Sequence, residues 1–195
     1  MLHTGVASVT FRQMRPDEVI DLAVKAGLEA IEWGGDVHVP HGDIKAAAET
    51  LKMTKDAGLI VSSYGSYYRV GCDKNTNPPF EAVLNTAIRL GASCIRVWAG
   101  DRGSDKADEK WWDTVVEDSI NIAAIAQKEN INIAYEFHGN TLTDTNESAV
   151  RLIKAVGMQN VGIYWQPPID TTFEYRREGL KAISLWLKNL HVFNW

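Results

Sequence analysis

Short runs of apolar and aromatic residues recur along the chain, and helical patterns separate them. The runs are rich in Val, Ile and aromatic residues and carry apolar side chains on both faces, as strands of a buried parallel sheet do. We expect one strand in each of these runs: Gly5–Phe11, Ala30–Trp33, Ile60–Tyr64, Cys94–Trp98, Asn132–Phe137, Val161–Gln166 and Leu190–Trp195. The pattern therefore predicts seven parallel strands that helices cover.

Between the strand-like runs, apolar residues repeat at positions i, i+3, i+4 and i+7. This spacing places them on one stripe of a helix, which is typical of an amphipathic helix lying on a sheet. The clearest sets are Val19, Leu22, Ala23 and Ala26, then Phe80, Val83, Leu84 and Ala87, and finally Ala149, Leu152, Ile153 and Val156. Strands and helices are thus expected to alternate along the chain.

A glycine or an asparagine lies between each helical pattern and the strand that follows it. These two residue types accept the left-handed backbone conformation that ends many helices. The six positions are Gly27, Gly58, Gly91, Asn130, Gly157 and Asn189. They lie roughly thirty residues apart, which is the length that a strand with a returning helix needs.

Two architectures use such units, the (β/α)8 TIM barrel and the open doubly wound sheet. The open sheet often has a glycine-rich phosphate loop after its first strand, whereas Thr10–Gln13 contains no such motif. The regular unit length favours the barrel, and eight units need about 250 residues. We therefore expect residues 1–195 to form a single TIM-barrel domain, truncated after strand seven and with its C-terminal quarter missing. The open sheet edges of that domain favour a homo-oligomer.

Composition and charge narrow the function classes. The 195 residues carry a net charge of −5 and form no basic stripe, which argues against a nucleic-acid partner. No apolar run is long enough to cross a membrane, and the N-terminus does not resemble a secretory signal. The two cysteines, Cys72 and Cys94, are too few for a disulfide scaffold, so we expect a cytoplasmic protein.

A carboxylate interrupts the apolar strand over Asn132–Phe137. A buried carboxylate costs several kcal/mol unless it is paired or binds a metal, and Glu136 therefore pairs with Arg96 on the neighbouring strand or acts as a ligand or a base. Gln166 and His191 occupy the equivalent ends of the next two strands. Carboxylate, amide oxygen and imidazole together suit a divalent metal ion, Mn²⁺, Mg²⁺, Co²⁺ or Zn²⁺.

Two of these predicted ligands have alternative interpretations. His191 is also compatible with a hydrogen-bonded core histidine, and Gln166 is also compatible with a hydrogen bond to a sugar hydroxyl. His38 and His41 follow the second strand, where a histidine is either an exposed loop residue or a substrate contact that transfers protons.

Aromatic and cationic residues gather at the predicted strand ends, where a TIM barrel has its active site. Aromatic rings there form an apolar wall for the C–H face of a sugar. Arg69 and Arg96 suit a phosphate or carboxylate, although Arg96 equally suits a pair with a glutamate. The predicted substrate-binding residues are Glu32, Trp33, His38, Arg96, Trp98, His138, Trp165 and Trp195.

Three segments, in this order, resemble the xylose isomerase-like TIM-barrel superfamily of sugar phosphate isomerases and epimerases. They are Ala26–Trp33 (AGLEAIEW), Ala134–Asn140 (AYEFHGN) and Leu190–Val192 (LHV). The resemblance implies one divalent cation, held by Glu, Asp, His and Glu at the ends of strands five to eight. Glu136 matches the first of these ligands and His191 the third, whereas Gln166 stands where Asp is usual and no residue matches the last glutamate.

The resemblance also implies proton transfer alpha to a carbonyl of a small carbohydrate substrate, with Glu136 as ligand and base. The predicted function is a metal-dependent isomerase or epimerase of a sugar, sugar phosphate or polyol. A polyol dehydratase with the same metal and base is one alternative, and a degenerate, non-catalytic sugar-binding barrel is another. The endonuclease branch of the superfamily is disfavoured, because the chain has five histidines and is acidic.

Overall fold

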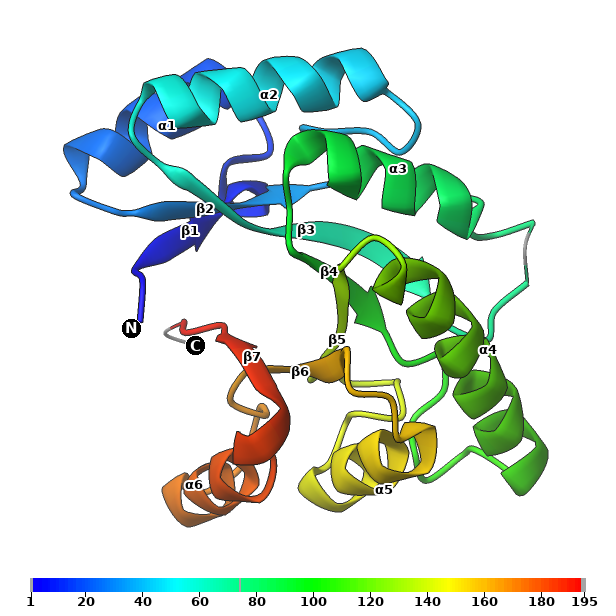
Figure 1. Ribbon diagram of the computed structural model, residues 1–195. Helices are drawn as coiled ribbons and strands as arrows, with labels where there is room; N and C mark the ends of the chain where they lie inside the picture. The colour runs from blue at the N-terminus through cyan, green and yellow to red at the C-terminus, as the bar shows by residue number, and fades with distance from the viewer. Residues whose placement is uncertain (1, 74, 194–195) are drawn as a thin grey trace. The chain divides into compact units, whose positions relative to one another are not determined.

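The protein is described by a computed structural model that covers residues 2–73 and 75–193 (Figure 1). Its strands lie in one sheet in chain order. The first and second, second and third, fifth and sixth, and sixth and seventh strands pair in parallel. They are β1 (Gly5–Ala7), β2 (Ala30–Gly34), β3 (Ile60–Arg69), β4 (Cys94–Trp98), β5 (Asn132–Glu136), β6 (Val161–Trp165) and β7 (Leu187–Leu190). The predicted alternation of strands and helices is confirmed.

The helices follow the strands as the apolar spacing predicts. The α-helices are α1 (Pro16–Lys25), α2 (Ile44–Asp56), α3 (Phe80–Leu90), α4 (Glu109–Gln127), α5 (Asn146–Val156) and α6 (Phe173–Ala182). Two short 3₁₀ helices, η1 (Ser8–Phe11) and η2 (Ser184–Trp186), complete the elements of the described residues.

The chain forms two compact units. Unit 1 consists of Met1–Tyr67 and Pro78–Ile95, and unit 2 consists of Tyr68–Asn77 and Arg96–Trp195. The boundaries fall inside β3 and β4, so the C-terminal ends of both strands belong to unit 2. The expectation of a single domain over residues 1–195 stays a prediction.

In unit 1, helices α1 and α2 lie together along the strands, and α2 packs against α3 (Figure 1). The aromatic side chains at the end of β2 and in β3 form the centre of its core. Trp33 and Tyr64 are both fully buried. The Trp33 indole N–H donates to Thr54 Oγ1 at 3.2 Å, and the Tyr64 hydroxyl donates to the Val39 carbonyl at 2.8 Å. Each buried polar atom thus has a partner, as burial requires.

In unit 2, α4 packs against α5 and α5 against α6, while α4 lies beside β5 and α5 beside β6. The residues that alternate with the polar ones on β5 and β6 are buried, among them Ile133, Tyr135 and Ile163. The hydroxyl of the fully buried Tyr135 donates to Ser119 on α4. The core of unit 2 therefore lies between the strands and these helices, and the strand ends remain available for chemistry.

The predicted helix ends are confirmed at five of six positions. Gly27, Gly58, Gly91, Gly157 and Asn130 all adopt the left-handed conformation, with φ between 57° and 75°. This is the conformation that ends a helix through backbone hydrogen bonds to its last carbonyls.

The prediction of a helix end at the sixth position is wrong, because Asn189 lies in β7. The preceding helix ends at Ala182, and η2 carries the chain to the strand. The side-chain amide of Asn189 donates to the Tyr164 hydroxyl at 2.8 Å, so it ties β7 to β6. The seventh strand consequently begins earlier than predicted and ends at Leu190.

The predicted first strand is too long, because it ends at Ala7 and Ser8–Phe11 form η1. The buried Ser8 hydroxyl accepts a hydrogen bond from the Gly34 backbone N–H at 2.9 Å, which replaces continued strand pairing. The third strand is longer than predicted and reaches Arg69. Among the described residues, no helix is long and apolar enough to cross a membrane.

Gly179 tests the packing of α6 against α5. A Cβ at this position would collide with the side-chain amide of Asn146. Gly179→Ala is therefore expected to lower the free energy of unfolding by about 1–3 kcal/mol, the usual cost of overpacking. Helix propensity alone predicts the opposite, a gain of about 1 kcal/mol.

The measurement is urea unfolding followed by circular dichroism. Gly139→Ala is the matched control, because a Cβ at Gly139 meets nothing within 4 Å. We expect the control to change stability by less than about 0.5 kcal/mol. A Gly179→Ala variant as stable as the wild type would contradict this packing.

Candidate functional site

A buried ion pair joins the ends of β4 and β5 in unit 2. Glu136 is the last residue of β5, and Arg96 lies in β4 with its side chain 2% exposed. The Arg96 guanidinium donates to Glu136 Oε2, and the Trp98 indole N–H donates to the same oxygen at 2.6 Å. Because side chains two residues apart on a strand share a face, Arg96 and Trp98 both reach Glu136 while Val97 points into the core. The pair that the sequence offered as one interpretation of Glu136 is thus present.

These contacts keep Glu136 ionised. Burial by itself raises the pKa of the carboxyl group. The neighbouring His191, the charge of Arg96 and the Trp98 N–H outweigh burial and lower the pKa to about 2. At neutral pH the site therefore contains a fixed carboxylate.

The other oxygen of Glu136 faces a different group of residues. His191 Nδ1 lies 3.7 Å from Glu136 Oε1 and 3.4 Å from Gln166 Oε1. The Gln166 amide donates through Nε2 to the Phe137 carbonyl at 2.5 Å, which turns its Oε1 toward His191. The structure thus brings the three predicted metal ligands together.

The donor set is compatible with a divalent cation. Ligand bonds of about 2.0–2.2 Å space neighbouring donor atoms by about 3–3.5 Å, close to the separations measured here. The set supplies one carboxylate oxygen, one amide oxygen and one imidazole nitrogen. Within the described ranges, no three or more His, Cys, Asp or Glu side chains form a group that could hold a metal ion, so Gln166 has to supply one of the ligands. The cation would consequently meet only one formal negative charge.

His191 is held by its backbone and its ring. It follows β7 directly, and its N–H donates to the Trp165 carbonyl at 2.9 Å. Its imidazole meets the Tyr164 ring edge-on, with the centroids 5.0 Å apart. Two strands therefore fix the position of this imidazole.

An aromatic stack lies beside the carboxylate. The His138 ring stacks on the Trp98 ring with centroids 4.5 Å apart, and the Arg69 guanidinium lies 4.6 Å from the Trp98 ring centroid. His138 Nδ1 is 2.8 Å from the Gly139 carbonyl. Because a carbonyl only accepts, Nδ1 carries the proton and Nε2 of the neutral ring has a free lone pair.

Of the two predicted substrate contacts near the C-terminus, Trp165 and Trp195, the structure describes only Trp165. Trp165 is half-buried, and its indole N–H is a buried donor without a hydrogen-bond partner among the described residues. Trp195 lies outside the described residues. The roles of both tryptophans in substrate binding stay predictions.

The predicted contacts in unit 1 make internal hydrogen bonds. Trp33 belongs to the core, as described above. Glu32 is buried and accepts from Ser63 Oγ at 3.1 Å. His38 is buried, with Nδ1 2.9 Å from Ser8 Oγ and Nε2 3.0 Å from the Met14 carbonyl. All three side chains make hydrogen bonds inside the protein, as residues that stabilise a fold do. Their roles in substrate binding also stay predictions.

His41 likewise lies inside unit 1. Its Nδ1 is 2.7 Å from the Tyr64 hydroxyl, and burial lowers the pKa of its imidazole. The neutral ring is thus favoured at this position.

Sequence reasoning missed Asn77, which fixes the segment that carries Arg69. The Arg69 N–H donates to Asn77 Oδ1 at 3.0 Å, and the Asn77 amide donates back to the Arg69 carbonyl at 2.7 Å. Asn77 lies in a polar loop without helical or strand spacing, so no signal in the sequence marks it.

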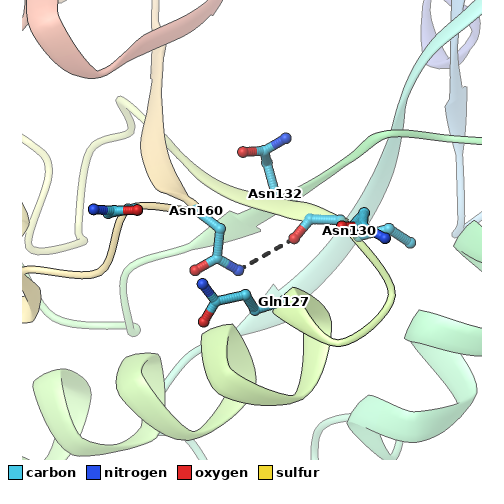
Figure 2. Close-up of a pocket in the computed structure, with 6 residues that line it drawn as sticks. Gln127, Asn130, Asn132 and Asn160 are labelled. Atoms are coloured by element: carbon cyan, nitrogen blue, oxygen red, sulfur yellow. Dashed lines mark hydrogen bonds between the residues drawn. The ribbon is translucent and has the colours of Figure 1, made fainter.

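A separate cavity of about 230 Å³ lies at the opposite ends of β5 and β6 (Figure 2). It is lined by Gln127, Asn130, Ile131, Asn132, Gln159 and Asn160. The Asn160 amide donates to the Ile131 carbonyl at 3.2 Å, as drawn in Figure 2. The cavity has no titratable side chain, so it offers no acid, base or charged ligand.

Comparison with known proteins identifies the family. Residues 20–168 match the family model described as Xylose isomerase-like TIM barrel. The chain belongs to this family. The resemblance noted from the sequence is confirmed. The predicted fold class, a TIM barrel of this type, is also confirmed, and the described residues form seven of its strands.

One curated relative is the 3-dehydroshikimate dehydratase of Bacillus anthracis, 22% identical over 188 residues. The match covers 91% of this chain and 65% of that protein, so the chain spans less than two thirds of the relative's length.

Solved structures show the same fold. The probable 3-DHS dehydratase AsbF of Bacillus anthracis matches with a TM-score of 0.83 and 21% identity, over 97% of this chain and 72% of that one. The 3-keto-D-glucoside 4-epimerase YcjR of E. coli matches with a TM-score of 0.79 and 16% identity, over 100% and 80%. A family protein of Mycobacterium smegmatis in complex with magnesium also has a TM-score of 0.79, with 15% identity over 98% and 74%. Proteins that share this fold thus include an epimerase, a probable dehydratase and a xylose isomerase-like TIM barrel protein in complex with magnesium.

The low pKa of Glu136 predicts a pH-dependent contribution to stability. The native pKa of about 2 lies below the value of about 4.3 for an unfolded glutamate. The stabilisation is therefore fully present above about pH 5 and is lost as the pH falls toward 2. Glu136→Gln leaves Arg96 buried without its counter-charge and is expected to cost about 3 kcal/mol at pH 7.

The measurement is urea unfolding of metal-free protein at several pH values between 7 and 3. We expect the difference in unfolding free energy between wild type and Glu136→Gln to shrink as the pH falls. The control is Glu109→Gln, whose carboxylate is 78% exposed in a surface pair with Arg151. The stability cost of that variant should stay below about 1 kcal/mol throughout. A pH-independent cost for Glu136→Gln would contradict the assignment.

Proposed function

We propose that this site removes the proton alpha to a carbonyl of a small hydroxylated compound, with a divalent cation held by Glu136, Gln166 and His191. One observation carries the proposal. The two oxygens of Glu136 have different partners: Arg96 and Trp98 contact Oε2, while Oε1 faces His191 and Gln166. One oxygen thereby fixes the carboxylate, and the other is directed at the proposed ligand cluster.

The cation, when bound, would polarise the substrate carbonyl and acidify the neighbouring C–H bond. Arg96 and Trp98 orient the carboxylate and hold it ionised. Phe137 sets the direction of the Gln166 amide through its backbone carbonyl. Supporting contacts of this kind commonly decide whether ligands are held well enough for catalysis.

His138 is the proposed proton acceptor. Its Nε2 carries the lone pair of the neutral ring, and the ring stacks on Trp98, whose N–H donates to Glu136. The sequence suggests Glu136 as both ligand and base, but a carboxylate with a pKa of about 2 is a weak base near neutral pH. We therefore assign ligation to Glu136 and proton transfer to His138.

Two reactions begin with this proton transfer. Return of the proton to another position or face gives an isomer or epimer of a sugar. Departure of the hydroxyl group beta to the carbonyl, which takes up the abstracted proton and leaves as water, gives a dehydrated product with a new C=C bond. The similarity to the 3-dehydroshikimate dehydratase favours dehydration as the second candidate. The product of the reaction distinguishes the two.

The test is proton NMR in D₂O with Mg²⁺ and three candidate substrates, D-fructose, D-psicose and 3-dehydroshikimate. We expect exchange of the alpha proton, or its loss with product formation, for at least one of them. Glu136→Gln should remove Mg²⁺ binding and exchange together. His138→Asn should keep Mg²⁺ binding and slow exchange by about 100-fold, the usual contribution of a general base.

His3→Asn is the control, since His3 is a half-exposed surface histidine of unit 1 paired with Glu29. Its exchange rate should equal that of the wild type. Mg²⁺ binding without exchange of any candidate substrate would contradict proton transfer and support the non-catalytic sugar-binding alternative. Exchange that survives in His138→Asn would contradict the role of His138 alone.

A further inference from the structure

Two arginines of unit 2 lie at the hydrogen-bonded pair of Trp98 and Glu136: Arg96 contacts the glutamate and Arg69 contacts the tryptophan. Arg96 is buried, and its charge is neutralised by Glu136. Arg69, the last residue of β3, is exposed and lies against the face of the Trp98 ring. Of these two arginines, Arg69 is the one whose positive charge lies outside the buried pair.

The backbone around Arg69 is fixed on both sides. Asn77 pairs with its N–H and its carbonyl, as described above. The next two residues are also held, because the Val70 N–H donates to the Trp98 carbonyl at 2.9 Å and the Gly71 N–H donates to Asp118 Oδ2 at 2.8 Å. The backbone that carries the Arg69 side chain is therefore ordered before binding, which lowers the entropic cost of using this residue.

Contact with a neutral ring leaves the charge of Arg69 unneutralised. Its guanidinium carbon lies over the Trp98 ring, 4.6 Å from the centroid, and the planar N–H groups of a guanidinium suit a carboxylate or phosphate bidentately. Within the described part of unit 2, no carboxylate lies within ion-pair distance of Arg69. The same Trp98 ring donates to Glu136 at 2.6 Å, so one aromatic side chain connects Arg69 with the proposed reaction centre.

We propose that Arg69 binds an anionic group of the substrate, so that this site takes a small hydroxylated compound with a carboxylate or a phosphate rather than a neutral sugar. The location of the anion site rests on the function proposed above. Its test measures binding without turnover, so the two proposals can fail separately.

The experiment is isothermal titration of the 195-residue chain, with Mg²⁺ present, against two matched ligand pairs. Quinate is a cyclic polyol with a carboxylate, and myo-inositol is a neutral cyclic polyol. D-fructose 6-phosphate and D-fructose differ by the phosphate. We expect at least one anionic ligand to bind about tenfold or more tightly than its neutral partner, as a charge-assisted hydrogen bond provides. The pair that shows the preference identifies the anion as carboxylate or phosphate.

Arg69→Gln should abolish the preference, and Arg69→Lys should restore part of it, because lysine keeps the charge but loses the planar donors. The matched control is Arg151→Gln. The guanidinium carbon of Arg151 also lies over a tryptophan, 4.0 Å from the Trp112 ring centroid, but on helices α4 and α5. It should leave the preference unchanged.

Several outcomes would overturn the anion site. They are equal binding within both ligand pairs, no binding of any of the four ligands, or a preference that Arg69→Gln retains. If the preference depends on Arg69 but no alpha proton exchanges, the anion site is supported and the proposed reaction is rejected. If an alpha proton exchanges but no anion is preferred, the proposed reaction is supported and the anion site is rejected.

Discussion

The buried ion pair between Glu136 and Arg96 is the interaction on which the rest of the site depends. A carboxylate at the end of an apolar strand is stable only where opposite charge and hydrogen bonds replace water. Arg96 and Trp98 provide both to one carboxylate oxygen. The other oxygen can then face His191 and Gln166 as part of a fixed group. The same pairing uses the charge of Arg96, which leaves Arg69 as the cation for an anionic substrate.

Much of the fold could be predicted from the sequence, because each element has a local signal. Strand composition, helical spacing and the left-handed caps at Gly91 and Asn130 depend on a few neighbouring residues. The error at Asn189 has a tertiary cause. An asparagine before an apolar run suggests a helix end, but here its amide donates to the Tyr164 hydroxyl on the neighbouring strand β6. That contact could not be inferred from spacing.

The site could be predicted in part for a similar reason. Parallel strands in chain order bring their carboxyl ends to one edge, so Glu136, Gln166 and His191 were expected to meet. The division of the two Glu136 oxygens between different partners depends on side-chain geometry and has no sequence signal. The clamp that Asn77 forms on Arg69 comes from an irregular loop and is also visible only in the structure.

The central claim is that Glu136, Gln166 and His191 together hold a divalent cation, and the most direct test is electron spin echo spectroscopy of the protein loaded with one equivalent of Mn²⁺. Nitrogen bound to Mn²⁺ modulates the echo at characteristic frequencies. The account predicts imidazole nitrogen modulation in the wild type that disappears in His191→Gln and persists in His138→Asn. Bound Mn²⁺ without nitrogen modulation, or modulation that survives in His191→Gln, would contradict it.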